Sequence, residues 1–63
     1  MSIPLTEKEL AVAELAAYGL TNQEIARALG LVLGTVKSRM HRILFKLGVA
    51  QRWDIDRALR GLK

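Results

Sequence analysis

Basic side chains recur along one stretch of the sequence, between apolar residues that keep a helical spacing. Val36, Met40, Ile43 and Leu47 stand three or four positions apart and therefore share one face of a helix. The same stretch carries these basic residues: Lys37, Arg39, His41, Arg42 and Lys46. Basic side chains bind phosphate oxygens, and lysine also donates to the O6 and N7 acceptors of guanine in the major groove. The pattern therefore predicts a helix with one buried face and one face suited to nucleic acid, and a solvated basic face is the alternative.

The composition of the chain also favours an acidic partner. The 63 residues, 7.0 kDa in mass, contain 10 Lys and Arg against 6 Asp and Glu, which gives a net charge of +4 and a pI near 10.1. A small chain with this charge attracts polyanions, although ordinary solubility is the simpler interpretation. Because 51% of the residues are apolar, the chain is not a disordered tail.

Several classes of function are excluded by the length and by the residue types. A chain this short has no room for a nucleotide-binding sheet or a deep cleft, and no nucleophile, base and orienting group come together. We therefore expect no enzyme activity, no small-molecule substrate and no cofactor. Cysteine is absent and His41 is the single histidine, so we expect neither a disulfide nor a metal site. No segment resembles a signal peptide or a membrane span, which predicts no membrane contact and a cytoplasmic location.

Local signals divide the sequence into four helical segments. Thr6 and Thr21 are each followed three residues later by a glutamate, which is the spacing of a capping box at the start of a helix. Glycines at positions 19, 30, 48 and 61 are placed to end helices. Strand-like alternation is absent from the sequence. We therefore expect one all-α domain over residues 1–63, with helices at about 7–18, 22–29, 34–47 and 51–60.

The second and third expected helices are joined by a tight turn that contains Gly30, an arrangement typical of a helix-turn-helix. The residues expected to form the buried seam around this turn are Ile25, Leu29, Leu31 and Val36. In a helix-turn-helix the second of the two helices enters the major groove, with its N-terminal part against the base edges. A helical hairpin without such a function is the alternative.

Four sequence blocks together resemble the LuxR/GerE-type helix-turn-helix domain. In chain order they are Leu-Thr-Glu-Lys-Glu at 5–9, Gly-Leu-Thr-Asn-Gln-Glu-Ile-Ala at 19–26, Thr-Val-Lys at 35–37, and Lys-Leu-Gly-Val at 46–49 with Arg52. The resemblance extends from about Leu5 to Leu59 and implies a four-helix domain that binds DNA in bacterial transcription. In such domains the third helix reads the major groove and the fourth often mediates dimerisation.

Two positions depart from the pattern of that family. The family usually has serine where this chain has Val32, and valine has no oxygen with which to cap the third helix. The family also favours histidine where this chain has Arg39. Residues 34–39 are similar to region four of the extracytoplasmic-function sigma factors, which reads promoter DNA and contacts RNA polymerase. The fold is the same under either resemblance, and the Lys-Leu-Gly-Val block with Arg52 favours the LuxR/GerE type.

The resemblance implies a role for individual polar residues. The expected base contacts are Lys37, Ser38 and His41. The expected phosphate contacts, which set the register on DNA, are Thr21, Asn22, Thr35, Arg39, Arg42 and Lys46. For Thr21 a helix cap is the simpler interpretation, and the two roles are compatible. Glu9 and Glu24 stand at helix starts, where negative charge is favoured, and either could also brace a basic side chain of the third helix.

On the fourth expected helix, Trp53 lies away from the apolar face. Its core-facing residues are expected to be Ile55, Ala58, Leu59 and Leu62, and Trp53 falls nearly opposite. Because exposed tryptophan and arginine are typical of protein interfaces, the expected dimer or partner interface consists of Val49, Trp53, Arg57 and Arg60. The alternative is that Trp53 folds back over Val49. The apolar run at 31–33 is expected to be buried locally, or to touch thymine methyl groups or a partner.

These patterns predict a sequence-specific transcription regulator that binds double-stranded DNA, as a homodimer or in contact with RNA polymerase. The competing hypothesis is a small protein-interaction module that binds RNA polymerase or another regulator, with DNA binding secondary. A stand-alone bacterial or phage regulator and the output domain of a longer one both fit the sequence.

Overall fold

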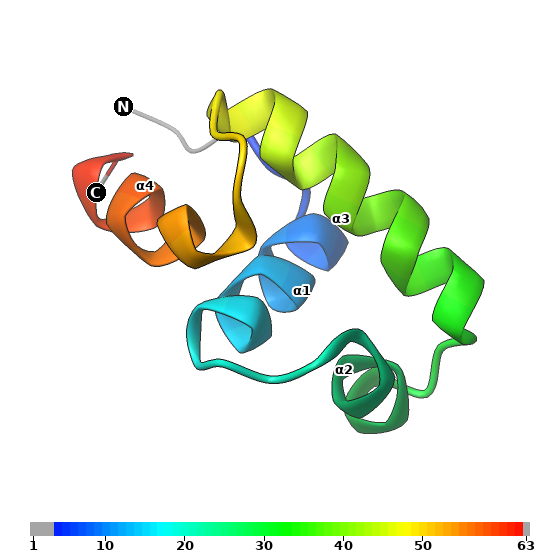
Figure 1. Cartoon of the computed structure of the whole chain (residues 1–63). Helices are drawn as coiled ribbons and strands as arrows, with labels where there is room; N and C mark the ends of the chain where they lie inside the picture. The colour runs from blue at the N-terminus through cyan, green and yellow to red at the C-terminus, as the bar shows by residue number, and fades with distance from the viewer. Residues whose placement is uncertain (1–3, 63) are drawn as a thin grey trace.

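The chain folds as helices, and α1 lies in the middle of the arrangement (Figure 1). The computed structural model describes residues 4–62. In this part of the chain the elements are α1 (Glu7–Ala17), α2 (Asn22–Leu29), α3 (Leu33–Leu47), a 3₁₀ turn η1 (Arg52–Asp54) and α4 (Ile55–Leu62). No strand occurs between residues 4 and 62. The all-α class and the four helices are therefore confirmed.

Both expected capping boxes are formed. At the start of α1 the Thr6 hydroxyl accepts the Glu9 N–H at 3.1 Å, and Glu9 Oε1 accepts the Thr6 N–H at 2.9 Å. Thr21 and Glu24 repeat this exchange at the start of α2, at 3.2 and 2.8 Å. These bonds satisfy backbone donors that a helix start otherwise leaves without an intrahelical partner.

The turn between α2 and α3 depends on Gly30. Its φ of 66° lies in the left-handed region, which residues with a Cβ rarely adopt. The turn is closed by the Leu31 N–H, which donates to the Ala26 carbonyl at 2.8 Å. This bond reverses the chain within a few residues, so α3 can begin at Leu33 and pack against α2.

Val32 occupies the N-cap position of α3, and its side chain makes no capping hydrogen bond. Its carbonyl accepts the N–H groups of Thr35 and Val36 at 3.1 and 3.3 Å. The start of α3 is therefore held by backbone bonds alone, as the Val32 side chain predicts.

The fourth helix differs from the expectation at both ends. Residues 52–54 form a 3₁₀ turn, closed by an Asp54 N–H to Gln51 carbonyl bond of 3.1 Å, and α4 begins only at Ile55. It then continues through Gly61, because this glycine keeps a negative φ, whereas Gly19, Gly30 and Gly48 adopt a positive one. The prediction that Gly61 ends the helix is wrong.

The core is built from all four α-helices, and α1 contacts each of the others. The fully buried side chains are Val12, Ala13, Ile25, Val36, Ile43 and Ile55. In the expected seam, Ile25 and Val36 are buried and Leu31 is half-buried, but Leu29 is 38% exposed. Leu29 ends α2 and borders an open groove instead of the seam. On α4 the predicted core residues Ile55 and Leu59 are buried and Ala58 is half-buried; the Leu62 side chain lies outside the described residues.

Candidate nucleic-acid interface

The α3 helix has a buried face and an exposed face. Val36, Met40 and Ile43 are buried against the other helices. Each of the three expected base contacts, Lys37, Ser38 and His41, is exposed. Because successive residues turn by about 100°, Ser38 and His41 fall opposite the buried residues and Lys37 lies at the edge of that face. The structure therefore brings the three side chains together on one accessible surface of one helix.

The expected phosphate contacts of α3 flank this surface. Arg42 is exposed, whereas Thr35 and Arg39 are half-buried, so all three side chains remain reachable by a ligand. Lys46 lies in the last turn of α3 and retains a side-chain exposure of 36%. The α3 sequence contains no acidic residue, so nothing on the helix itself offsets the positive charge of this surface.

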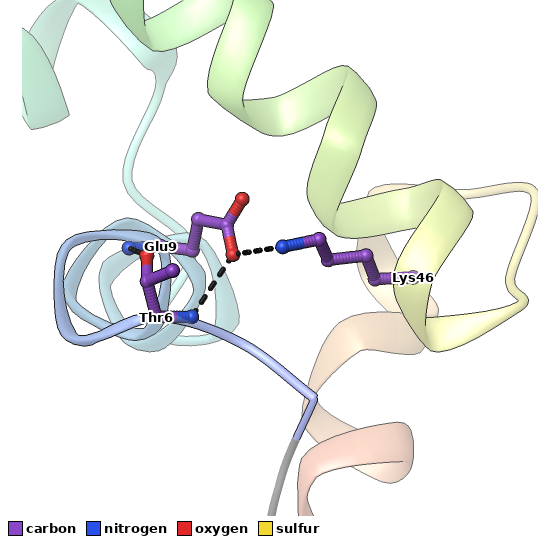
Figure 2. Close-up of polar contacts among 3 residues, drawn as sticks. All are labelled: Thr6, Glu9 and Lys46. Carbon is purple, nitrogen blue, oxygen red and sulfur yellow. Dashed lines mark hydrogen bonds and ion pairs between the residues drawn. The ribbon is translucent and has the colours of Figure 1, made fainter.

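Lys46 has a protein partner that orients it (Figure 2). Its Nζ lies 2.7 Å from Glu9 Oε1, the same oxygen that accepts the Thr6 N–H at 2.9 Å. Glu9 is 6% exposed and belongs to the first turn of α1. The hydrogen bond from Lys46, followed by the backbone bond from Thr6, lowers the pKa of the Glu9 carboxyl. The proposed bracing of a basic α3 side chain by Glu9 is thus present, while Glu24 is an exposed capping residue.

The start of α2 is fixed by Arg52, a residue to which the sequence argument gave no contact. Its guanidinium donates to Asn22 Oδ1 at 2.7 Å and to the Leu20 carbonyl at 2.8 Å. Arg52 belongs to η1, so these bonds tie the segment after α3 to the first residue of α2 and to the segment before it. Thr21 is exposed and Asn22 is half-buried, so the two expected phosphate contacts of α2 lie at a position that Arg52 defines.

Trp53 is 74% exposed, which confirms the expected partial exposure and excludes its folding back into the core over Val49. Val49 is half-buried, and its N–H donates to the Leu44 carbonyl at 3.1 Å. Arg57 and Arg60 are exposed, and the Arg60 guanidinium pairs with Asp56 one turn earlier on α4. The four residues expected at a protein interface are thus accessible to different degrees, Val49 least.

Further large apolar side chains stand in solvent. Val32 is 71% exposed and Leu33 is 39% exposed, whereas Leu31 is half-buried, so local burial accounts for only part of the apolar run at 31–33. Phe45 on α3 and Tyr18 after α1 are exposed at 87% and 85%. Sequence reasoning missed Phe45, although its helical angle, opposite Val36 and Ile43, was available from the sequence.

The described residues show neither a metal-binding cluster nor a membrane-spanning helix. Between residues 4 and 62, no three His, Cys, Asp or Glu side chains gather closely enough to hold a metal ion. None of the helices in this same part of the chain has the length and apolar character needed to cross a membrane.

Comparison with known proteins identifies a family that the chain matches. Residues 3–58 match the family described as bacterial regulatory proteins, luxR family. The chain is 45% identical over 49 residues to the uncharacterized transcriptional regulatory protein YxjL of Bacillus subtilis, and the match covers 78% of this chain and 22% of the relative. It is 44% identical over 50 residues to the transcriptional regulatory protein LnrK of the same organism, covering 79% and 23% of the two chains.

The response regulator protein VraR of Staphylococcus aureus is similar as well, with 46% identity over 48 residues, covering 76% of this chain and 23% of that protein. The match with each of these relatives thus spans less than a quarter of the relative's length. The family and the names of the relatives support DNA-binding transcription regulation and no enzymatic activity.

Proposed function

This chain belongs to the LuxR family of bacterial regulatory proteins, and we propose that it binds double-stranded DNA sequence-specifically by placing α3 in the major groove. The observation that carries the proposal is the exposed α3 face with Lys37, Ser38 and His41, opposite a face buried in the core. Burial of that second face holds the helix rigidly on the body of the domain. We take residues 1–63 to act as one domain, in the cytoplasm, where bacterial DNA is located.

In this proposal some α3 residues contact base edges and others bind the phosphate backbone of the DNA. Lys37 donates to guanine, while Ser38 and His41 each donate or accept and so adapt to several bases. Thr35, Arg39 and Arg42 bind phosphates on either side of the groove. Lys46 donates one N–H to Glu9, and since an ammonium has three donors, those that remain are available for a phosphate.

The start of α2 supplies a phosphate contact in addition to those of α3. Arg52 donates to Asn22 Oδ1, so the Nδ2 group is the part of this amide that is left to donate to a phosphate. Thr21 holds the first turn of α2 in place through its capping box, and its exposed position leaves it available to the same phosphate. The contact of Thr21 and Asn22 with this phosphate would fix the angle at which α3 enters the groove.

We further propose that Trp53, with Val49, Arg57 and Arg60, forms an interface with a second copy of the chain. The exposure of Trp53 supports this role, because an aromatic side chain with 74% of its surface in water gains free energy on burial at an interface. The same surface would serve the second candidate function, contact with RNA polymerase or another regulator. A homodimer requires an inverted-repeat site, whereas a contact with another protein requires only a single half-site.

The salt dependence of DNA binding tests the proposal. The affinity of the chain for a short duplex that holds one half-site is measured by fluorescence anisotropy at several salt concentrations. The logarithm of the association constant is expected to fall linearly with the logarithm of salt concentration, with a slope of about −0.9 per phosphate contact. Arg42→Ala is expected to flatten the slope by about one unit, and the control Arg57→Ala, on α4, is expected to leave it unchanged on a half-site. A parent affinity that is independent of salt contradicts the proposal.

A further inference from the structure

Phe45 is an exposed apolar side chain on the helix that carries the cationic face. It is 87% exposed, more than any other large apolar residue described, and it belongs to α3. At about 100° per residue, Phe45 falls within about 60° of Ser38 and His41 and nearly opposite Val36 and Ile43. It therefore shares the face of α3 that carries the proposed base contacts, one helical turn beyond His41.

The occupant of this face has to be negatively charged. The helix that carries Phe45 also carries Lys37, Arg42 and Lys46, and its fifteen residues include no Asp or Glu. A basic protein would be repelled by this face, and although Lys46 already pairs with Glu9, an uncharged surface would offer Lys37 and Arg42 no counter-charge. Charge complementarity thus favours a polyanion, and double-stranded DNA in particular, since the face is that of the proposed reading helix.

Within the major groove one group matches a phenyl ring chemically. The base edges present hydrogen-bond donors and acceptors, and the single apolar group among them is the 5-methyl of thymine. Phenylalanine has no hydrogen-bonding group, so it gains free energy in the groove only from an apolar contact. His41 and Phe45 are separated by about 6 Å along the helix axis, so the contacted base pair would flank the pair that His41 reads.

We propose that Phe45 contacts the 5-methyl group of a thymine at the edge of the recognised site and so determines specificity at that base pair. This inference rests on the proposed function, because it assumes that α3 lies in the major groove. It assigns Phe45 a contact that is distinct from the hydrogen bonds of Lys37, Ser38 and His41.

The experiment removes the methyl group alone. The parent chain first selects its preferred site from a random-sequence duplex library, and each thymine of that site is then replaced singly by uracil. At one flanking thymine we expect the parent affinity to fall about fourfold, the factor that corresponds to about 0.8 kcal/mol for one buried methyl-sized group. Phe45→Ala is expected to bind the thymine duplex more weakly than the parent does, and to bind the thymine and uracil duplexes equally.

Two further variants make the result specific to Phe45. Tyr18→Ala removes an equally exposed aromatic ring that lies outside α3, and it is expected to keep the fourfold ratio. Val32→Ala removes the exposed apolar side chain at the start of α3, and it too is expected to keep the ratio at that thymine. Because Phe45 is exposed, Phe45→Ala should melt at the parent temperature, which is checked by circular dichroism.

The possible outcomes separate this inference from the proposed function. A uracil series with no effect in the parent overturns the inference, as does a Phe45→Ala variant that keeps the parent ratio or a Val32→Ala variant that abolishes it. In each of these cases the chain still selects a DNA site, so the proposed function stands. If the parent selects no sequence at all, the proposed function fails, and the Phe45 contact fails with it.

Discussion

Lys46 Nζ lies 2.7 Å from Glu9 Oε1, and this ion pair joins the last turn of α3 to the first turn of α1. The same Glu9 oxygen accepts the Thr6 N–H in the capping box of α1. One carboxylate therefore both caps a helix and holds the far end of the proposed reading helix against the domain (Figure 2).

The Glu9–Lys46 pair makes the stability of the domain depend on pH. Lys46 and Thr6 lower the pKa of Glu9 in the folded state, so ionised Glu9 stabilises the fold at pH values above the pKa that this carboxyl has in the unfolded chain. This contribution decreases as the pH falls through the lowered pKa. We expect Glu9→Gln to unfold at less urea than the parent at pH 7, and the difference to shrink as the pH falls from about 5 to about 3. A difference that stays constant over this range would show that the charge of Glu9 is irrelevant.

Arg52→Ala is expected to destabilise the domain by about 1.5–3 kcal/mol, because Asn22 Oδ1 and the Leu20 carbonyl both lose a charged donor. Arg52→Lys should recover only part of the loss, since one ammonium does not reproduce the fork that spans both acceptors. Urea unfolding measures both variants, with exposed Arg57→Ala as the control, expected within about 0.5 kcal/mol of the parent. Equal stability of Arg52→Ala and the control would mean that the two bonds contribute nothing.

Much of the local structure was predictable because it depends on residues close together in the chain. Thr6 with Glu9 and Thr21 with Glu24 form capping boxes within three residues, and the missing cap at Val32 follows from its side chain alone. The spacing of Val36, Met40 and Ile43 likewise predicts which face of α3 is buried.

The remaining features depend on packing between distant segments. The Arg52 contacts join residues that are 30 and 32 positions apart in the sequence, and no local sequence pattern predicts a contact between residues so far apart. Leu29 looked like a core residue by type, but its exposure is set by how α2 meets its neighbours. Gly61 was expected to end α4 because glycine often does so, yet a glycine ends a helix only where the chain turns there.

Val32→Ser is expected to stabilise the domain by about 0.5–2 kcal/mol, because a serine at the N-cap offers an oxygen to the first free N–H groups of α3. The exposed valine side chain contributes little to the core, so its loss should not cancel this gain. Thermal melting followed by circular dichroism measures the change, and Val32→Ala, which adds no cap, is the control. A lower melting temperature for Val32→Ser than for Val32→Ala would rule out the capping argument.

Trp53→Ala is expected to weaken association of the chain while leaving its folding stability nearly unchanged. Since Trp53 is 74% exposed, its removal should change the free energy of unfolding by no more than about 0.5 kcal/mol. Association should weaken by about 2 kcal/mol or more if the ring is an anchor at the centre of an interface. Sedimentation equilibrium and melting of the variant and the parent measure the two effects. The proposed interface between two copies fails if the parent stays monomeric at high concentration, and the wider interface proposal fails if the parent also binds no partner protein.

The central claim is that α3 reads base edges and that Lys37 is one of the reading residues. The direct test ranks the affinities of the parent, Lys37→Ala and Arg42→Ala for a set of duplexes that differ from the selected site at single base pairs. We expect Lys37→Ala to lose about 1–3 kcal/mol on the selected site and to relax the preference at one or two positions. Arg42→Ala should weaken all duplexes alike and keep their order. If the order of duplexes is the same for Lys37→Ala as for the parent, Lys37 does not contact a base and the account of this helix is wrong.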